Sequence, residues 1–151
     1  MAIRICEVEL HPVDQAERDS FHENHDCTVV AVAGAADIPY REAHALLAKA
    51  GRKPRHGFKF RTWLNNQCWG AHIKGEKFRL GAYTVTRIIL PWYNKYNQGV
   101  TLAQFLRDFP RGRFLLRKSG HVFFVDDGKV LNLGSTGVRT RITNLWHLER
   151  V

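Results

Sequence analysis

The clearest pattern in the chain is a change from polar to apolar residues over positions 22–36. Residues 22–26 read HENHD, a single cysteine follows at Cys27, and residues 28–36 read TVVAVAGAA. A segment that is apolar on every side predicts a buried helix, although its valines and Gly34 are weak helix formers and a buried strand is the competing interpretation. Cys27 therefore stands where a predicted buried segment meets a polar surface.

A second helix is predicted over residues 39–50. Pro39 suits the first helical position, and apolar residues recur after it at helical spacing, namely Tyr40, Ala43, Leu46, Leu47 and Ala50. Gly51 ends the pattern, with Arg52 and Lys53 just beyond it. The short connection predicts a helical hairpin in which this apolar face packs onto the buried helix.

The C-terminal half combines one capped helix with several strand-like runs. In residues 100–110, Thr101 and Gln104 predict a capping box at the start of a helix. Pro110 predicts the end of that helix, and Val100 with Phe105 predicts a hydrophobic staple. Strands are predicted at residues 3–10, 83–90, 113–118, 121–125, 129–133 and 140–146. Helices followed by a meander of strands predict an α+β fold, with N-terminal helices packed on an antiparallel β-sheet.

The chain of 151 residues is expected to form one domain, residues 1–151, because no linker or internal repeat interrupts it. The pattern divides it into a helical subregion at 24–51, a basic, aromatic-rich insert at 52–100, and the capped helix with its sheet at 101–148. The secondary structure of the insert stays open, apart from the strand at 83–90.

One hairpin has a register that can be predicted. Asp127 and Gly128 favour a two-residue type I′ turn, because both central positions of that turn require positive φ. With this turn Phe123 faces Asn132, and one face of the hairpin carries His121, Phe123, Val125, Val130 and Asn132. His121 and Asn132 are then diagonal neighbours, whereas a shift of one residue would send them to opposite faces.

Composition bounds the setting of the protein. The chain is 44% hydrophobic and 25% charged, which is ordinary for a globular domain. Its start lacks the apolar core of a signal peptide, and no run approaches about 18 apolar residues, so we expect neither export nor a membrane span. Cys6, Cys27 and Cys68 are irregularly spaced, which argues against a disulfide framework and for a cytoplasmic protein with free thiols.

The net charge of +9 is unevenly spread. Residues 1–26 hold seven acidic and two basic side chains, whereas residues 52–87 hold nine basic side chains and one acidic one, Glu76. Such asymmetry indicates an acidic partner or nucleic acid, and a solvated basic face is the alternative interpretation.

The position of Cys27 suits a reactive thiol. The thiolate is the nucleophilic form, and a helix N-terminus and a nearby imidazolium both lower the pKa of a cysteine. Cys27 lies in or near the first turn of its predicted helix, with Asp26 as the N-cap. His121 would supply the imidazolium, and Asn132 would fix its tautomer.

Three segments together resemble small papain-like cysteine peptidases, including stand-alone enzymes of bacteria and their tailed phages. They are NHDCTVVAVA, IPYREAHALLAKAGRK and TLAQFLRDFPRGRFLLRKSGHVFFVDDGKVLN, and they cover residues 24–50 and 101–133. The resemblance implies a papain-like fold in which Cys27 is the nucleophile, His121 the general base and then acid, and Asn132 the residue that orients the ring. It implies a protein or peptide substrate, no cofactor or metal, and a host cytoplasm if the gene belongs to a phage.

The chain departs from the family at one position. The family places a Gln shortly before the cysteine to complete the oxyanion hole, whereas Phe21 occupies that position here. Asn24 and Gln15 are the nearest amide side chains, so they are the predicted oxyanion donors.

Other residues admit other functions. His22, His25, Cys27, Cys68 and His72 supply enough ligands for zinc, but no C-x2-C pair or HExxH motif accompanies them. Cys68, next to Gln67, is an alternative nucleophile. A group of basic and aromatic residues could stack bases or bind an acidic partner, namely Arg55, Lys59, Arg61, Trp63 and Trp69. The alternative is that the aromatic residues belong to the core. The second expectation is therefore a catalytically inactive papain-like scaffold that binds a host protein or nucleic acid through residues 52–87.

Overall fold

The computed structural model of the chain describes residues 4–6, 16, 26–53, 58–73, 77–88, 100–133, 137 and 139–151. Its helices are α2 (Cys27–Ala36), α3 (Tyr40–Lys49), α4 (Phe60–Ile73) and α5 (Leu102–Asp108). Its strands are β1 (Arg4–Cys6), β2 (Phe78–Leu80), β3 (Tyr83–Ile88), β4 (Val100–Thr101), β5 (Arg113–Lys118), β6 (His121–Asp126), β7 (Lys129–Leu131), β8 (Arg141–Ile142) and β9 (Asn144–Arg150). None of the helices in these ranges has the length and apolar character needed to cross a membrane.

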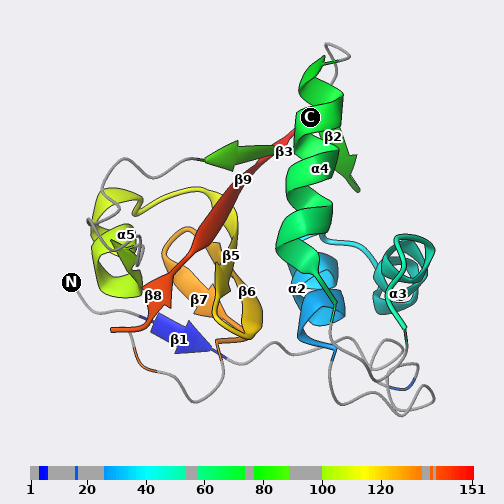
Figure 1. Cartoon of the computed structure of the whole chain (residues 1–151). Coiled ribbons are helices and arrows are strands. Elements are labelled where there is room, and N and C mark those ends of the chain that lie inside the picture. Colours follow the sequence, from blue (N-terminus) through cyan, green and yellow to red (C-terminus); the bar gives the residue numbers. More distant parts are fainter. Residues whose placement is uncertain are drawn as a thin grey trace.

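Seven of the described strands form one sheet in the order β1-β7-β6-β5-β9-β3-β2 (Figure 1). Six of them are antiparallel to their neighbours, whereas the edge strand β1 runs parallel to β7. The predicted α+β class is confirmed, and the prediction of an antiparallel sheet is wrong only for β1. The strand β9 joins the two halves of the sheet, because it pairs with β5 along one edge and with β3 along the other.

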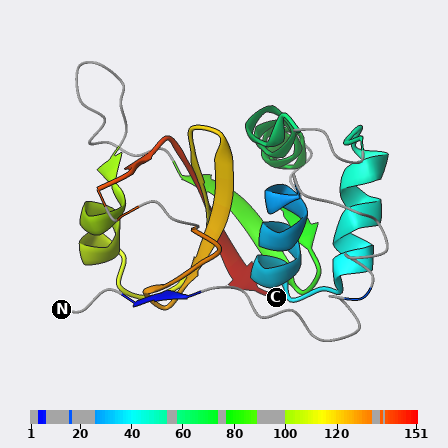
Figure 2. The ribbon, with the colours of Figure 1, turned by 90° about the horizontal axis from the view of Figure 1, so that it is seen from below.

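Helices cover both faces of the sheet. The helices α2, α3 and α4 lie together on one side and α5 lies on the other, with the strands between them (Figures 1 and 2). Along β6, Val122 and Phe124 join the core on the α2 side, whereas Phe123 and Val125 join the core on the α5 side. Burial on both faces explains why the strands at 113–118 and 121–125 read as continuous apolar runs.

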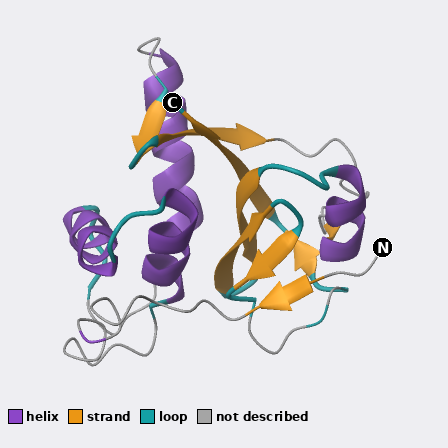
Figure 3. Ribbon diagram, turned by 180° about the vertical axis from the view of Figure 1, so that it is seen from behind, coloured by secondary structure: helices purple, strands orange, loops and turns teal. Residues whose placement is uncertain are grey.

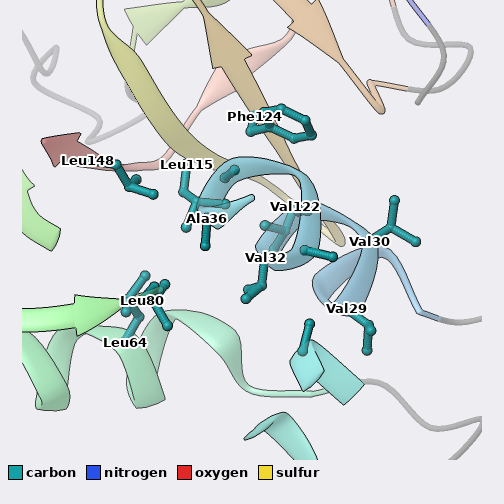
Figure 4. Packing of buried hydrophobic residues seen from close by; sticks show 14 of the residues in the cluster. Val29, Val30, Val32, Ala36, Leu64, Leu80, Leu115, Val122, Phe124 and Leu148 are labelled. Carbon is teal, nitrogen blue, oxygen red and sulfur yellow. The ribbon is translucent and has the colours of Figure 1, made fainter. Parts of the chain in front are cut away.

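The helix α2 is buried along its whole length after Cys27, apart from Gly34, which is half-buried. The predicted buried helix is therefore confirmed, and the competing strand is wrong. Gly34 has a packing reason, because a Cβ atom at this position would lie 2.5 Å from the ring of Phe124. Figure 4 shows Val32 and Ala36 of α2 close to the labelled side chains of β5 and β6. In this view Leu64 and Leu80 lie below them.

The helical hairpin is also confirmed. Tyr40, Ala43 and Leu47 are the buried residues of α3, and they belong to the same core as α2. Pro39 is the N-cap residue rather than the first helical residue. Gly51 follows the helix with a φ of 110°, a conformation that glycine adopts without strain.

The insert contains a helix that the sequence pattern did not predict. The helix α4 buries Phe60 and Leu64 in the core on the α2 side. Asn65 accepts a hydrogen bond of 3.0 Å from the indole N–H of the fully buried Trp146, which ties α4 to β9. The strand β2, which pairs with β3, was not predicted either.

Figure 3 shows the strands from behind, with helices to either side of them. Two differences from the prediction concern the C-terminal half. The predicted strand at 140–146 is divided into β8 and β9 at Thr143, whose backbone N–H donates to the Arg117 oxygen at 2.8 Å. At the start of α5 the Thr101 hydroxyl accepts from the Gln104 backbone N–H, as predicted. The Gln104 side chain binds Asp108 instead of closing the capping box.

Candidate active site

The β6–β7 hairpin has the predicted turn and register. Asp127 and Gly128 both have positive φ, 47° and 80°, and Val125 pairs with Val130. The ladder ends at the pair Phe124–Leu131. Beyond it Asn132 takes a left-handed conformation, with a φ of 64°.

The fold brings Cys27 and His121 together. Cys27 is the first residue of α2 and is half-buried, and His121 is the first residue of β6. The His121 ring and the backbone N–H of Val122 lie close enough to the sulfur to act on its pKa through hydrogen bonding. Because that N–H belongs to the main chain of β6, the sheet itself holds a donor against the sulfur.

The surroundings of Cys27 favour its thiolate. Burial raises the pKa of the thiol, but the His121 ring and the Val122 N–H more than offset this effect, so the pKa of Cys27 lies below its ordinary value. Asp26 opposes the shift through its negative charge. The position at the start of a helix adds the positive end of the helix dipole.

The same interaction favours the imidazolium form of His121. Its hydrogen bond with Cys27 raises the pKa of the ring above its ordinary value, against the effect of burial, and the Asn132 carbonyl acts in the same direction. Nε2 of His121 lies 2.6 Å from the Asn132 backbone oxygen, which can only accept, so Nε2 carries a proton. Nδ1 is thus the ring nitrogen left for the sulfur. The ring also stacks on Phe123 at 6.2 Å between centroids.

Asn132 orients the ring in a different way from the one predicted. The sequence indicated its side-chain amide, whereas the structure uses its main-chain carbonyl. The left-handed backbone at Asn132, placed just after the ladder ends, accompanies this contact. Asn is one of the few residues besides Gly that adopt this conformation readily.

The first turn of α2 places backbone N–H donors beside the sulfur. Asp26 is the N-cap residue, as predicted, but its side chain makes no capping hydrogen bond. Its carboxylate instead accepts a hydrogen bond of 2.7 Å from the Tyr40 hydroxyl. The Val30 N–H donates to the Asp26 backbone oxygen, so the N–H groups of residues 27–29 precede the first intrahelical bond. Main-chain donors at this point were not part of the prediction, although the polar-to-apolar boundary at Cys27 indicated a helix start.

Cys68, the alternative nucleophile, has the opposite environment. It lies within α4 and contacts the core on the α2 side. Its thiol donates to the Val85 backbone oxygen at 3.7 Å. Burial raises the pKa of Cys68 to about 11, so this thiol stays protonated at neutral pH.

The remaining predicted residues fall into two groups. Lys59 and Arg61 are exposed near the start of α4, and Trp63 packs between Phe58, Phe60 and Phe78. Five other predicted residues lie outside the described residues. They are the oxyanion candidates Gln15 and Asn24, the basic residue Arg55, and the zinc candidates His22 and His25. The side chains of Cys6, Trp69 and His72 also lie outside the described residues. Within the described ranges no cluster of three or more His, Cys, Asp or Glu side chains is placed to hold a metal ion.

Comparison of the chain with protein-family models, curated proteins and solved structures found no match. The assignment of the site therefore depends on its own geometry. That geometry is a half-buried thiol at a helix start, an imidazole fixed by a main-chain carbonyl, and backbone donors around the sulfur.

Proposed function

We propose that the protein is a cysteine-dependent hydrolase of the peptidase or amidase type, with a papain-like arrangement of its catalytic groups. The observation that carries this proposal is the contact of the Cys27 sulfur with the His121 ring and the Val122 N–H. It lowers the pKa of the thiol and raises the pKa of the imidazole, and both shifts favour the thiolate–imidazolium pair that thiol catalysis uses.

The reaction follows from these groups. The Cys27 thiolate attacks the carbonyl carbon, and N–H groups in the first turn of α2 stabilise the oxyanion. The carbon–nitrogen bond then breaks, and the His121 imidazolium gives its proton to the departing amine. A water molecule, losing a proton to His121, attacks the thioester. The carbon–sulfur bond then breaks, which releases the carboxylic acid and restores the Cys27 thiolate and the His121 imidazolium.

Each partner has a defined part in this scheme. The Asn132 carbonyl holds the Nε2 proton, so the ring turns Nδ1 toward the sulfur in every step. Cys68 takes no part, because burial keeps it protonated. A catalytically inactive scaffold is the second candidate, and it would have no use for a thiol with a lowered pKa.

An activated ester separates the two candidates. With p-nitrophenyl acetate we expect a burst of one equivalent of nitrophenol, an acetyl group on Cys27 by mass spectrometry, and continuing turnover. Cys27→Ala should remove the burst and the turnover, whereas the matched variant Cys68→Ala should keep both. Acetylation without turnover, or acetylation spread evenly over the thiols, would favour the inactive scaffold.

A further inference from the structure

A pocket opens between the start of α4 and the end of β5. It has a volume of about 410 Å³ and is lined by Phe58, Lys59, Phe60, Arg61, Thr62 and Arg117. Phe60 is buried and packs edge-on against Trp146, so the pocket has a firm apolar wall. Three of its six lining residues are basic.

Among the residues that the structure describes, the basic side chains of the pocket have no acidic partner. Lys59 and Arg61 are exposed, and within the described residues no ion pair joins them or Arg117 to a carboxylate. Arg117 is half-buried, and its side chain donates to the Thr143 hydroxyl at 3.0 Å. Burial lowers the pKa of the Arg117 guanidinium, and the positive charge of Arg61 lowers it further. An anion between these two guanidinium groups would relieve their repulsion.

Strand pairing connects one wall of the pocket to the surroundings of Cys27. Arg117 pairs directly with Val122 across the β5–β6 ladder, and the Val122 N–H is the main-chain group that contacts the Cys27 sulfur. Directly paired residues of an antiparallel ladder lie about 5 Å apart between Cα atoms. They also share a face of the sheet, and here that is the α2 side, because Val122 belongs to the core on that side.

We propose that this pocket is the subsite that receives an acidic side chain of a peptide substrate, and this inference depends on the proposed function. A glutamate or aspartate there would place its carboxylate between Arg61 and Arg117 and its stem against Phe58 and Phe60. The substrate backbone would continue toward Cys27. The enzyme would therefore prefer acyl or amine groups that carry a carboxylate next to the bond that it cleaves.

The aromatic residues favour a peptide over nucleic acid. Single strands bind by stacking their bases on exposed aromatic faces. Here Trp63 has Phe58, Phe60 and Phe78 as ring neighbours at 5.9 to 6.0 Å, and Phe60 is buried against Trp146. Phe60 and Trp146 belong to the core and the other three rings are partly buried against it, so what the pocket offers a ligand is mainly positive charge.

Paired covalent probes test the subsite. Peptidyl vinyl sulfones that differ only by Glu or Gln at each position in turn would be reacted with the whole protein, and the modification of Cys27 followed by mass spectrometry. We expect one position at which the Glu probe reacts roughly 10-fold faster, as one charge-assisted contact would give. Arg61→Gln and Arg117→Gln should bring this ratio close to one. The matched variant Arg79→Gln, which removes an exposed charge on β2, should leave it unchanged.

The outcomes separate the two proposals. If iodoacetamide modifies Cys27 of the unaltered protein no faster than Cys68, the proposed function is wrong. If Cys27 reacts rapidly with iodoacetamide but the Glu to Gln ratio is one at every position, only the subsite is wrong. If a single-stranded oligonucleotide slows the reaction of the probes, and this effect is lost in Arg61→Gln and Arg117→Gln, the ligand of the pocket is nucleic acid rather than a peptide.

Discussion

The His121 ring is held between two groups, and its bond to Asn132 is made to the main chain, with Nε2 2.6 Å from the carbonyl oxygen. On its other side the ring interacts with the Cys27 sulfur. A main-chain acceptor cannot be removed by substitution, so the orientation of the ring depends on the backbone of the β6–β7 hairpin. The Cys27–His121 pair is therefore coupled to the register of the sheet.

Variants of Asn132 should depend on backbone conformation rather than on the amide group. Asn132→Gly should keep the alkylation rate of Cys27 within about twofold, because glycine adopts the left-handed φ of 64° without strain. Asn132→Ala should destabilise the fold by about 1–2 kcal/mol in urea unfolding, because alanine is strained there. A large loss of Cys27 reactivity in Asn132→Gly, with the fold intact, would show that the side chain orients the ring.

Gly34→Ala should disturb the packing that positions α2. The added methyl group would meet the Phe124 ring, and overpacking of this kind costs about 1–3 kcal/mol. The free energy of unfolding measures this cost, and Phe124→Leu in the same chain should recover part of it. Fully additive effects of the two substitutions would contradict the proposed contact, because residues in contact are expected to couple.

Asp26→Asn should make Cys27 more acidic. The charge of Asp26 raises the pKa of the neighbouring thiol, so its removal should move the pH midpoint of Cys27 alkylation downward. Tyr40→Phe is the matched variant, because it removes the hydrogen bond of 2.7 Å but keeps the charge. An upward movement of the midpoint in Asp26→Asn would mean that the carboxylate supports the thiolate.

Cys68 should be almost inert in the folded protein. A thiol with a pKa of about 11 holds roughly 100-fold less thiolate at neutral pH than one with the ordinary value. Iodoacetamide should therefore modify Cys68 at a comparable rate only after unfolding in urea. Rapid modification of Cys68 under native conditions would return it to consideration as the nucleophile.

The sequence was most informative where local chemistry decides the structure. The turn at Asp127-Gly128 requires positive φ at both positions, so it set the register that places His121 near the end of the ladder. The unbroken apolar run after Cys27 predicted a buried segment, and the structure shows that it is a helix rather than the competing strand. These two features predicted the helix and the hairpin that carry Cys27 and His121, whereas the pairing of the two residues was predicted from thiol chemistry and from the resemblance to papain-like peptidases.

The parts that escaped prediction depend on long-range packing or on single backbone angles. The helix α4 has a weak periodicity, and its buried face is defined by distant partners such as Trp146. The contact of the Asn132 carbonyl depends on the left-handed backbone of this one residue, just beyond the end of the ladder. The hydrophobic and polar pattern of the sequence does not predict such a backbone angle. The Val122 N–H is a main-chain donor, so residue types could not reveal it.

The most direct measurement is the pH dependence of Cys27 alkylation by iodoacetamide, with the site assigned by mass spectrometry, in the unaltered protein and in His121→Ala. His147→Ala, a histidine on β9, is the matched control. Because His121 lowers the pKa of Cys27, the unaltered protein should show a midpoint below the ordinary cysteine value, and His121→Ala alone should move it upward. The same midpoint in all three proteins, or modification of Cys27 no faster than of Cys68, would contradict the thiolate–imidazolium pair and the hydrolase proposed from it.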